Sequence, residues 1–279
     1  MFYVGPHVSI SSSIALAPVR ARELNATGFG MFTRNQRQWV SKALTDDEIE
    51  SFKKAMKENG YTADMVLPHD SYLINLGCPD REKRRKSIDA FIEEEKRVSA
   101  LGLKYLNFHP GSHLNAITKR ECMILIAEAL VEAMEAVPTV HPILEITAGM
   151  GSNLGSSIEE LKEIIELAGN DSRIGICIDT CHAFQAGYDI STPEKAKAFF
   201  DRVDDALPSR LRGLHLNDAK ADCGCHLDRH ESLGKGKIGL DTFLYIANDK
   251  RFEGIPMVLE TPNTDLWREE ISTLLRGNL

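Results

Sequence analysis

The sequence predicts a (β/α)₈ barrel of the TIM type, a single domain with its active site at the C-terminal ends of the strands. Eight short β-branched or apolar runs alternate with amphipathic segments, and this alternation is typical of a parallel sheet. A length of 279 residues suits one closed barrel. No repeat, low-complexity tract or linker divides residues 1–279, so we expect one domain.

The predicted strands are short apolar runs spread along the whole chain. In order they are Phe2–Val4, Gly28–Phe32, Met65–Leu67, Tyr105–Phe108, Val140–Leu144, Ile174–Ile178, Leu211–Leu214 and Met257–Leu259. Apolar residues at spacings of three and four predict helices at Asp46–Glu58, Arg81–Leu101, Glu121–Ala136, Ile158–Ala168 and Pro193–Ala206. Two helix starts are well marked: Thr45 and Glu48 have capping-box spacing, and Thr192 precedes Pro193 at the first helical position.

Composition restricts the compartment and the partners. The first residues lack the pattern of a secretory signal, and no apolar run approaches the roughly 18 residues of a membrane helix, so we expect no membrane partner. Six cysteines without framework spacing are typical of reduced thiols, and we expect a cytoplasmic protein. The net charge of −8 argues against nucleic acid as a partner. That objection weakens if part of the acidic surplus binds cations in one cleft.

Potential metal ligands follow most of the predicted strands. Six strands lead directly, or through one residue, to a ligand at the same end: His69, His109, Glu145, Asp179, His215 and Glu260. Three more lie just beyond strands, namely His182, Asp228 and His230. A single His or Glu at a strand end is more often a hydrogen-bonded structural residue than a ligand. Six at one face of a barrel indicate a metal-dependent active site.

The donor set restricts the metal and the reaction. Imidazole and carboxylate ligands without cysteine suit zinc or manganese. Nine ligands exceed the needs of two catalytic zinc ions, since each takes about three protein ligands, so we infer three metals. Such a cluster lowers the pKa of a bound water to about 7 and favours hydrolysis of a phosphodiester.

Several strings resemble the endonuclease IV family of apurinic/apyrimidinic endonucleases. They are HDSYLINLG (69–77), FHPGSHL (108–114), GICIDTCH (175–182), HLNDAK (215–220) and DRHESLGKG (228–236). The resemblance covers essentially the whole chain. It implies a DNA-repair enzyme with three Zn²⁺ that cleaves 5′ to abasic sites in double-stranded DNA, leaving a 3′-hydroxyl and a 5′-deoxyribose phosphate. It also implies removal of groups that block 3′ ends; we expect a monomer.

The resemblance also implies roles for the nine ligands. His69, His109 and Glu145 would bind the first metal. Glu145, as a bridge, would join Asp179, His215 and Glu260 at the second. His182, Asp228 and His230 would form the third site, which can also take Mn²⁺. Glu145 and Glu260 would be the catalytic carboxylates, the first bridging the metals around a nucleophilic hydroxide and the second orienting it.

Two loops are the predicted DNA reader. By resemblance, Arg37, Tyr72 and Leu73 would push into the helix so that the abasic nucleotide flips out, which is cheapest where a base is missing. For Trp39 and Ile74, packing beneath the loops is an equally good interpretation.

The chain departs from the family pattern after Glu145. Ile146 and Met150 stand where the family usually has Asn and Gln. Neither is a ligand, so catalysis should survive, although a hydrogen bond that supports a ligand could be missing.

The sequence leaves two alternatives open. A sugar isomerase or epimerase of the xylose isomerase-like barrels would share the strand-end ligands, but the His182, Asp228 and His230 set and the SYL loop (71–73) argue against it. A barrel that binds damaged DNA without cutting would not need all nine ligands. The CGC string at 223–225 lacks the usual zinc spacing, and Cys177 and Cys181 are expected to be packing thiols.

Overall fold

The protein, described by a computed structural model over residues 1–276, is a closed barrel of eight parallel strands, which confirms the predicted fold. The strands are β1 (Tyr3–Val8), β2 (Phe29–Phe32), β3 (Val66–His69), β4 (Tyr105–Phe108), β5 (His141–Glu145), β6 (Gly175–Asp179), β7 (Leu211–His215) and β10 (Pro256–Leu259). Each pairs with the next in chain order, and β10 closes the barrel against β1. A two-stranded antiparallel sheet, β8 (Asp218–Ala219) with β9 (His230–Glu231), lies outside the barrel.

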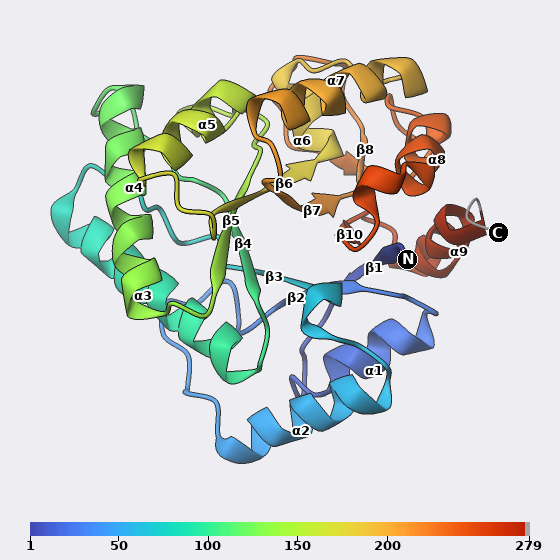
Figure 1. Cartoon of the computed structure of the whole chain (residues 1–279), viewed down its shortest axis with the longest axis horizontal. Helices are drawn as coiled ribbons and strands as arrows, with labels where there is room; N and C mark the ends of the chain where they lie inside the picture. The colour runs from blue at the N-terminus through green and yellow to red at the C-terminus, as the bar shows by residue number, and fades with distance from the viewer. Residues whose placement is uncertain (277–279) are drawn as a thin grey trace.

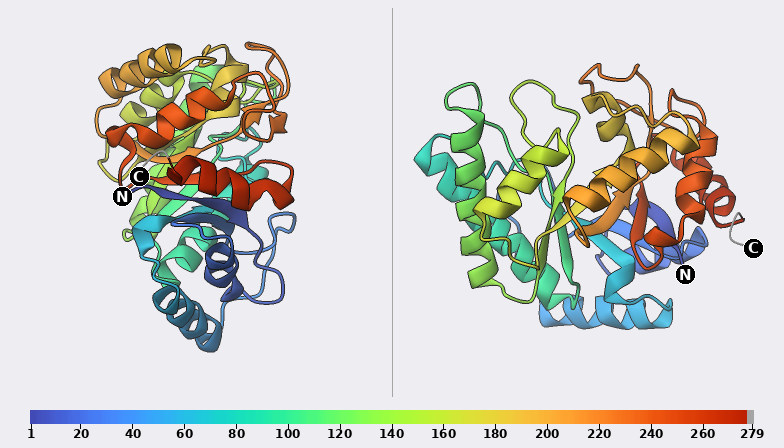
Figure 2. Two further views of the ribbon diagram at one scale, coloured as in Figure 1. Left: turned by 90° about the vertical axis from the view of Figure 1, so that its right-hand side faces the viewer. Right: turned by 45° about the horizontal axis from the view of Figure 1, so that its top comes forward.

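Helices surround the strands (Figure 1), and the further views show the same ring from the side (Figure 2). They are α1 (Leu16–Glu23), α2 (Asp46–Glu58), α3 (Arg81–Ala100), α4 (Lys119–Ala136), α5 (Ile158–Leu167), α6 (Thr180–Ala186), α7 (Pro193–Ala206), α8 (Leu240–Asn248) and α9 (Trp267–Arg276). Short 3₁₀ turns cover Ala63–Met65, Lys250–Phe252 and Thr264–Leu266. Within residues 1–276, none of these helices combines the length and apolar character needed to cross a bilayer.

Both helix starts that the sequence marked are present. The Thr45 hydroxyl accepts a hydrogen bond from the amide of Glu48, and the Glu48 carboxylate accepts one from the amide of Thr45 at 2.8 Å. Thr192 caps α7, with Pro193 as the first helical residue. Each cap satisfies amide groups that the first helical turn leaves without partners.

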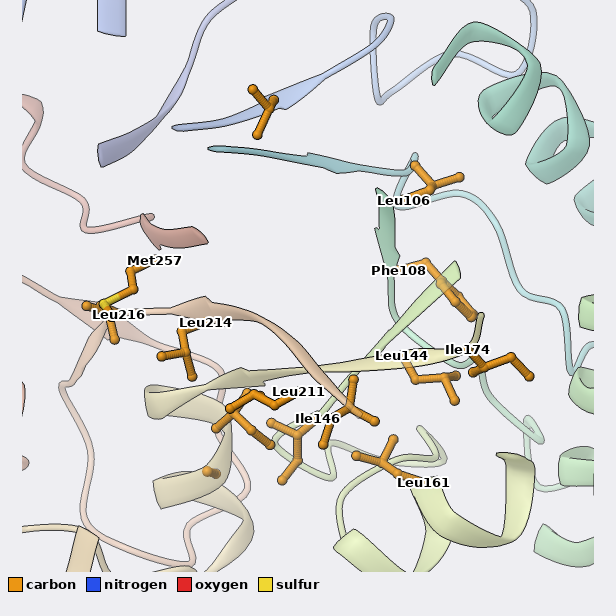
Figure 3. Packing of buried hydrophobic residues seen from close by; sticks show 14 of the residues in the cluster. Leu106, Phe108, Leu144, Ile146, Leu161, Ile174, Leu211, Leu214, Leu216 and Met257 are labelled. Atoms are coloured by element: carbon orange, nitrogen blue, oxygen red, sulfur yellow. The ribbon is translucent and has the colours of Figure 1, made fainter. Parts of the chain in front are cut away.

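Alternation along the strands separates two apolar regions. Outward-facing residues such as Leu106, Phe108 and Leu144 pack in the main core against the surrounding helices (Figure 3). Leu67, Tyr105, Ile143, Cys177 and Val258 form a separate buried cluster. Side chains two apart on a strand point to the same face, so the residue two positions after each of Leu67, Ile143, Cys177 and Val258 continues the barrel interior. Those residues are the predicted ligands His69, Glu145, Asp179 and Glu260.

Candidate metal and active site

The barrel brings the strand-end side chains to one face. His69, Glu145, Asp179 and His215 are the last residues of β3, β5, β6 and β7. His109 and Glu260 directly follow β4 and β10. Parallel strands with matched register carry these residues to the same level, since Asp179 is paired with His215 across β6 and β7.

Glu145 is the centre of the site. Its side chain is buried, and its carboxylate oxygens lie 3.2 Å from Nε2 of His69 and 3.2 Å from Nδ1 of His215. Nδ1 of His182 is 3.1 Å away and Nε2 of His109 is 3.6 Å away. Four imidazoles from four different segments of the chain therefore converge on one carboxylate.

Three groups of histidine and carboxylate donor atoms have members within 4.8 Å of one another: His69, His109 and Glu145; Asp179, His215 and Glu260; and Asp179, His182 and His230. Two further groups each include a thiol, that of Cys177 or of Cys181. Asp228 lies beside the third group, with its Oδ1 atom 3.4 Å from Nε2 of His182 and 3.2 Å from Nε2 of His230. All nine residues singled out from the sequence are thus in one cluster. The structure adds that Asp179, expected in the second group alone, also faces the third.

The cluster pairs imidazoles with carboxylates so closely that both sets of pKa values shift. Burial opposes charge on His69, but its contacts with Asp70 and Glu145 outweigh burial and raise its pKa well above the usual value. Burial likewise opposes charge on His230, whose pKa is nevertheless raised to about 9, chiefly by Asp179 and Asp228. Burial alone would raise the pKa of Glu260, yet His215 and His7 lower it to about 2. Glu145, whose pKa the neighbouring histidines also lower, and Glu260 are therefore ionised at neutral pH, and their charge attracts cations to the site.

Three histidines of the cluster place Nδ1 within hydrogen-bonding distance of a backbone carbonyl. Nδ1 of His69 lies 3.0 Å from the carbonyl oxygen of Asp70, and Nδ1 of His182 lies 2.9 Å from that of Ile146. Nδ1 of His230 lies 3.3 Å from the carbonyl oxygen of Glu260. In the neutral ring, a proton on Nδ1 that is donated to a carbonyl leaves Nε2 available as a ligand, and this is the usual support for a metal-binding histidine.

One buried nitrogen atom, Nε2 of His230, strengthens the fit to metal ions. On His215 it is Nδ1 that faces the carboxylates, 3.2 Å from Glu145 and 3.3 Å from Glu260. Nε2 of His230 lies near the carboxylates of Asp228 and Asp179 but lacks hydrogen-bond geometry. Buried polar atoms without partners are rare and call for an explanation, and an ion shared with the nearby carboxylates supplies one. The oxygen and nitrogen donors suit zinc or manganese.

Two asparagines that support the candidate ligands were not predicted from the sequence. The amide of Asn107 on β4 donates to Glu145, and both residues are buried. The Asn217 amide donates to Asp179 at 2.7 Å, while its carbonyl oxygen accepts from the backbone N–H of Glu260 at 2.9 Å. One asparagine therefore orients ligands from two strands. The signal in the sequence was a polar residue within or just after an apolar strand.

The protein matches the model of the xylose isomerase-like TIM barrel family over residues 18–276. The chain belongs to this family. Its structure is similar to that of endonuclease IV from Thermus thermophilus, with a TM-score of 0.85, 29% identity, and coverage of 99% of this chain and 98% of the other.

Sugar epimerases share the barrel at lower identity. A D-tagatose 3-epimerase-like protein gives a TM-score of 0.76 at 17% identity, with 100% of this chain and 97% of the other covered. D-psicose 3-epimerase from Clostridium cellulolyticum gives 0.69 at 14% identity, with 98% and 97% covered. At these identities the likeness shows the fold alone.

Two loops carry the residues that sequence reasoning assigned to DNA. Tyr72 is 61% exposed, with its ring 5.8 Å from that of His69, so it stands at the edge of the candidate metal site. Arg37 is exposed on the loop after β2, and Leu73 is half-buried. The Ser71 hydroxyl donates to the carbonyl of Gln36 at 2.7 Å and so joins the two loops.

Trp39 and Ile74 have packing roles. Ile74 is buried in the main core. Trp39 is half-buried against that core, and the Lys86 ammonium lies 4.2 Å from the centroid of its ring. Both residues therefore pack beneath the loops, which is one of the two interpretations that the sequence allowed.

The departures at Ile146 and Met150 leave the ligands supported. The Ile146 side chain is buried among the apolar residues of the main core (Figure 3), and its backbone carbonyl is the group that contacts His182. Since that contact uses the main chain, the side-chain change does not remove it. Met150 accepts a hydrogen bond through its sulfur from the amide of Asp228 at 3.3 Å.

The cysteines near the site are buried. Burial is the main cause that raises the pKa of the Cys177 thiol well above its usual value, and burial also raises the pKa of Cys181. Both thiols therefore stay protonated at neutral pH. This agrees with the packing role expected for them, although both lie near ligand atoms.

Proposed function

We propose that this protein is a metal-dependent DNA-repair endonuclease that hydrolyses the phosphodiester 5′ to abasic sites. The products would be a 3′-hydroxyl and a 5′-deoxyribose phosphate. The observation that carries the proposal is the third donor group, Asp179, His182 and His230 with Asp228 beside it, which adjoins the two groups at the strand ends. The 29% identity to endonuclease IV over nearly the full length of both chains supports the same activity.

The residues present would hold three divalent ions, three Zn²⁺ or two with Mn²⁺ in the group of His182, Asp228 and His230. Bound there, the ions would supply an acidified water and neutralise charge on the phosphodiester. Glu145 is buried at the centre and contributes to the first group while lying 3.2 Å from His215 of the second. A carboxylate in that position fixes the spacing between the two groups.

Glu260 and Asp228 face the open side of the site. Their side chains are 19% and 39% exposed, whereas those of Glu145 and Asp179 are almost inaccessible. Glu260 remains ionised at neutral pH because its pKa is about 2. It is therefore the carboxylate able to accept a hydrogen bond from the attacking water and orient it, while Asp228 lies where a phosphate would approach the third group.

The substrate would be double-stranded DNA with an abasic site or a blocked 3′ end. Tyr72 and Leu73 follow the ligand His69 within four residues, so a side chain inserted into the duplex from this loop would fix the position of the lesion relative to the metals. An abasic nucleotide lacks base stacking, which lowers the cost of turning it into the site.

Sugar epimerisation is the second candidate, favoured by the pair Glu145 and Glu260. Two carboxylates on either side of a metal could exchange a proton with a carbon acid. However, this reaction offers no use for a third donor group with its own two histidines. The epimerase structures support the shared barrel and no more.

A single experiment separates these candidates. Metal-quantified protein is incubated with a duplex that contains one tetrahydrofuran abasic analogue, and the cut is mapped at nucleotide resolution, with the undamaged duplex as control. Ketohexoses are assayed with the same preparation. Incision 5′ to the lesion that chelator abolishes is expected. Epimerised sugar with an intact duplex would overturn the proposal.

A further inference from the structure

A buried ion pair lies at the base of the loop that carries Arg37. Glu94 on α3 is 1% exposed and Arg34, two residues after β2, is 6% exposed. Nε of Arg34 donates to one carboxylate oxygen of Glu94 at 2.6 Å, and the Thr33 hydroxyl donates to the other. Both oxygens of the carboxylate are therefore used by the first two residues of the loop.

The same arginine closes the loop upon itself. Nη1 of Arg34 donates to the backbone carbonyls of Gln38 and Trp39, at 3.2 and 2.9 Å. The amide of Arg37 donates to the side chain of Asn35 at 3.0 Å. Residues 34–39 thus form a closed turn with Arg37 at its exposed tip and Arg34 at its base.

Neighbouring groups hold the turn from two further sides. Arg97 on α3 donates to the Thr33 carbonyl at 2.6 Å and to the Lys42 carbonyl at 3.0 Å, which secures both arms of the loop. The Ser71 hydroxyl bonds the Gln36 carbonyl and so couples the turn to Tyr72. An exposed loop would ordinarily be mobile, whereas this one has charged anchors below it.

Stability alone is a poor reason for such an arrangement. Burying a charged pair costs desolvation that apolar side chains of the same volume avoid, and a buried pair is therefore weak support for stability. The pair is better suited to fixing the conformation of the loop, because a planar guanidinium group can bind a carboxylate and two carbonyls in fixed directions at once.

We infer that Arg34 and Glu94 are positioning residues that set the specificity for damaged DNA by presenting Arg37 in a fixed relation to Tyr72. The inference rests on the proposed function, since it assigns these two residues to its DNA-reading loops. Neither residue is among the metal-ligand groups. The pair should therefore govern recognition of the duplex and leave hydrolysis of a small phosphodiester unchanged.

The test uses Arg34→Lys with a matched control elsewhere in the chain. Lysine keeps the positive charge beside Glu94 but lacks the fork that reaches both carbonyls. Arg210 also donates to backbone carbonyls, those of Ile174 at 2.9 Å and Asn170 at 3.0 Å, at the opposite end of the barrel before β7. Arg210→Lys therefore also removes guanidinium bonds to backbone carbonyls, but away from the proposed DNA surface.

We expect Arg34→Lys to raise KM for the abasic duplex by about 10-fold, as loss of two hydrogen bonds would. The kcat, the metal content and the hydrolysis of bis(p-nitrophenyl) phosphate should change less than about 3-fold. Arg210→Lys should alter none of these. Asn35→Ala, a change in an exposed side chain, should raise KM in the same direction by a few-fold. Equal effects of the two lysine variants, or equal loss on both substrates, would overturn the inference.

Hydrogen exchange separates failure of this inference from failure of the proposed function. If the wild-type protein does not cut the abasic duplex, the proposed function is wrong and the assignment to DNA reading falls with it. Amide exchange in residues 34–40 then still measures the turn itself. Faster exchange in Arg34→Lys alone would show that the arginine orders the turn, and unchanged exchange would refute even that.

Discussion

Truncation of Tyr72 and Leu73 to alanine should separate lesion recognition from phosphodiester hydrolysis. The Tyr72 ring is 61% exposed and packs edge-on against Phe32 at 5.4 Å and tilted towards His69 at 5.8 Å. Because Phe32 and His69 contact only one side of the Tyr72 ring, the other side is free to contact DNA. Stacking of one such side chain on a base is worth about 1–3 kcal/mol in single-strand binders. The double variant should therefore bind an abasic duplex about 10- to 100-fold more weakly.

Fluorescence anisotropy with a labelled abasic duplex measures this loss, and bis(p-nitrophenyl) phosphate reports the chemistry, since it needs no flipping. Val40→Ala is the matched control, because Val40 is an apolar side chain that is 84% exposed on the neighbouring loop. We expect the control to bind as the wild type does, and the double variant to keep its metals and its small-substrate activity. Equal loss of binding and small-substrate hydrolysis would show that the loop merely supports His69, and the reasoning would be refuted.

Three further predictions concern the charges of the molecule. Glu145→Ala should lower the rate of DNA nicking by several orders of magnitude, because four histidines converge on that carboxylate. Cys223 is exposed, and Cys223→Ser should change the rate little. Steady-state rates of both variants under excess zinc measure the difference. Zinc binding near pH 7 should release protons, because the pKa of His230 is about 9 and the pKa values of His69 and His182 lie well above normal in the metal-free protein. Calorimetry in buffers of different ionisation enthalpy measures the number of protons released. Elemental analysis of the same protein should return about three metals per chain. Burial raises the pKa of Glu95 to about 8, so the contribution of its protonated form to stability is complete below about pH 4.5 and is lost as pH rises through 8. The free energy of unfolding should therefore fall between pH 5 and pH 8, and Glu95→Gln should remove up to about 4 kcal/mol of that fall. Urea denaturation of both proteins at the two pH values measures the difference.

The strands were predictable because each is a short apolar run whose end is marked by a polar ligand. All eight appear where they were expected, within a few residues at either end. The five predicted helices also appear, because each has one apolar face at helical spacing. Four helices, α1, α6, α8 and α9, were not predicted. In α6 six of the seven residues are buried, so no alternation of apolar and polar faces marks it.

The positions of the nine donors could be predicted from the sequence, but their division into groups could be predicted only in part. Parallel strands carry their ends to one level, which places His69, Glu145 and Asp179 together from sequence order alone. That Asp179 also faces His182 and His230 depends on how α6 turns back after β6, and on the path of the loop before β9. Contacts made by Asn107 and Asn217 likewise depend on the closed barrel, since their partners lie 38 residues or more away in sequence.

Most of the third donor group comes from elements outside the barrel strands, and this explains how barrels of the same fold can catalyse different reactions. The first two groups come from residues that end or follow barrel strands, and any eight-stranded barrel can offer such positions. His182 instead comes from α6, while Asp228 and His230 come from the segment between the small strands β8 and β9 and from the start of β9. These elements lie outside the barrel, and Asp179 at the end of β6 joins α6 to it by accepting a hydrogen bond from the backbone N–H of His182 at 2.8 Å. A change in these outer elements alone could therefore convert a site with two donor groups into one that can neutralise a phosphodiester, with no change to the strands beneath.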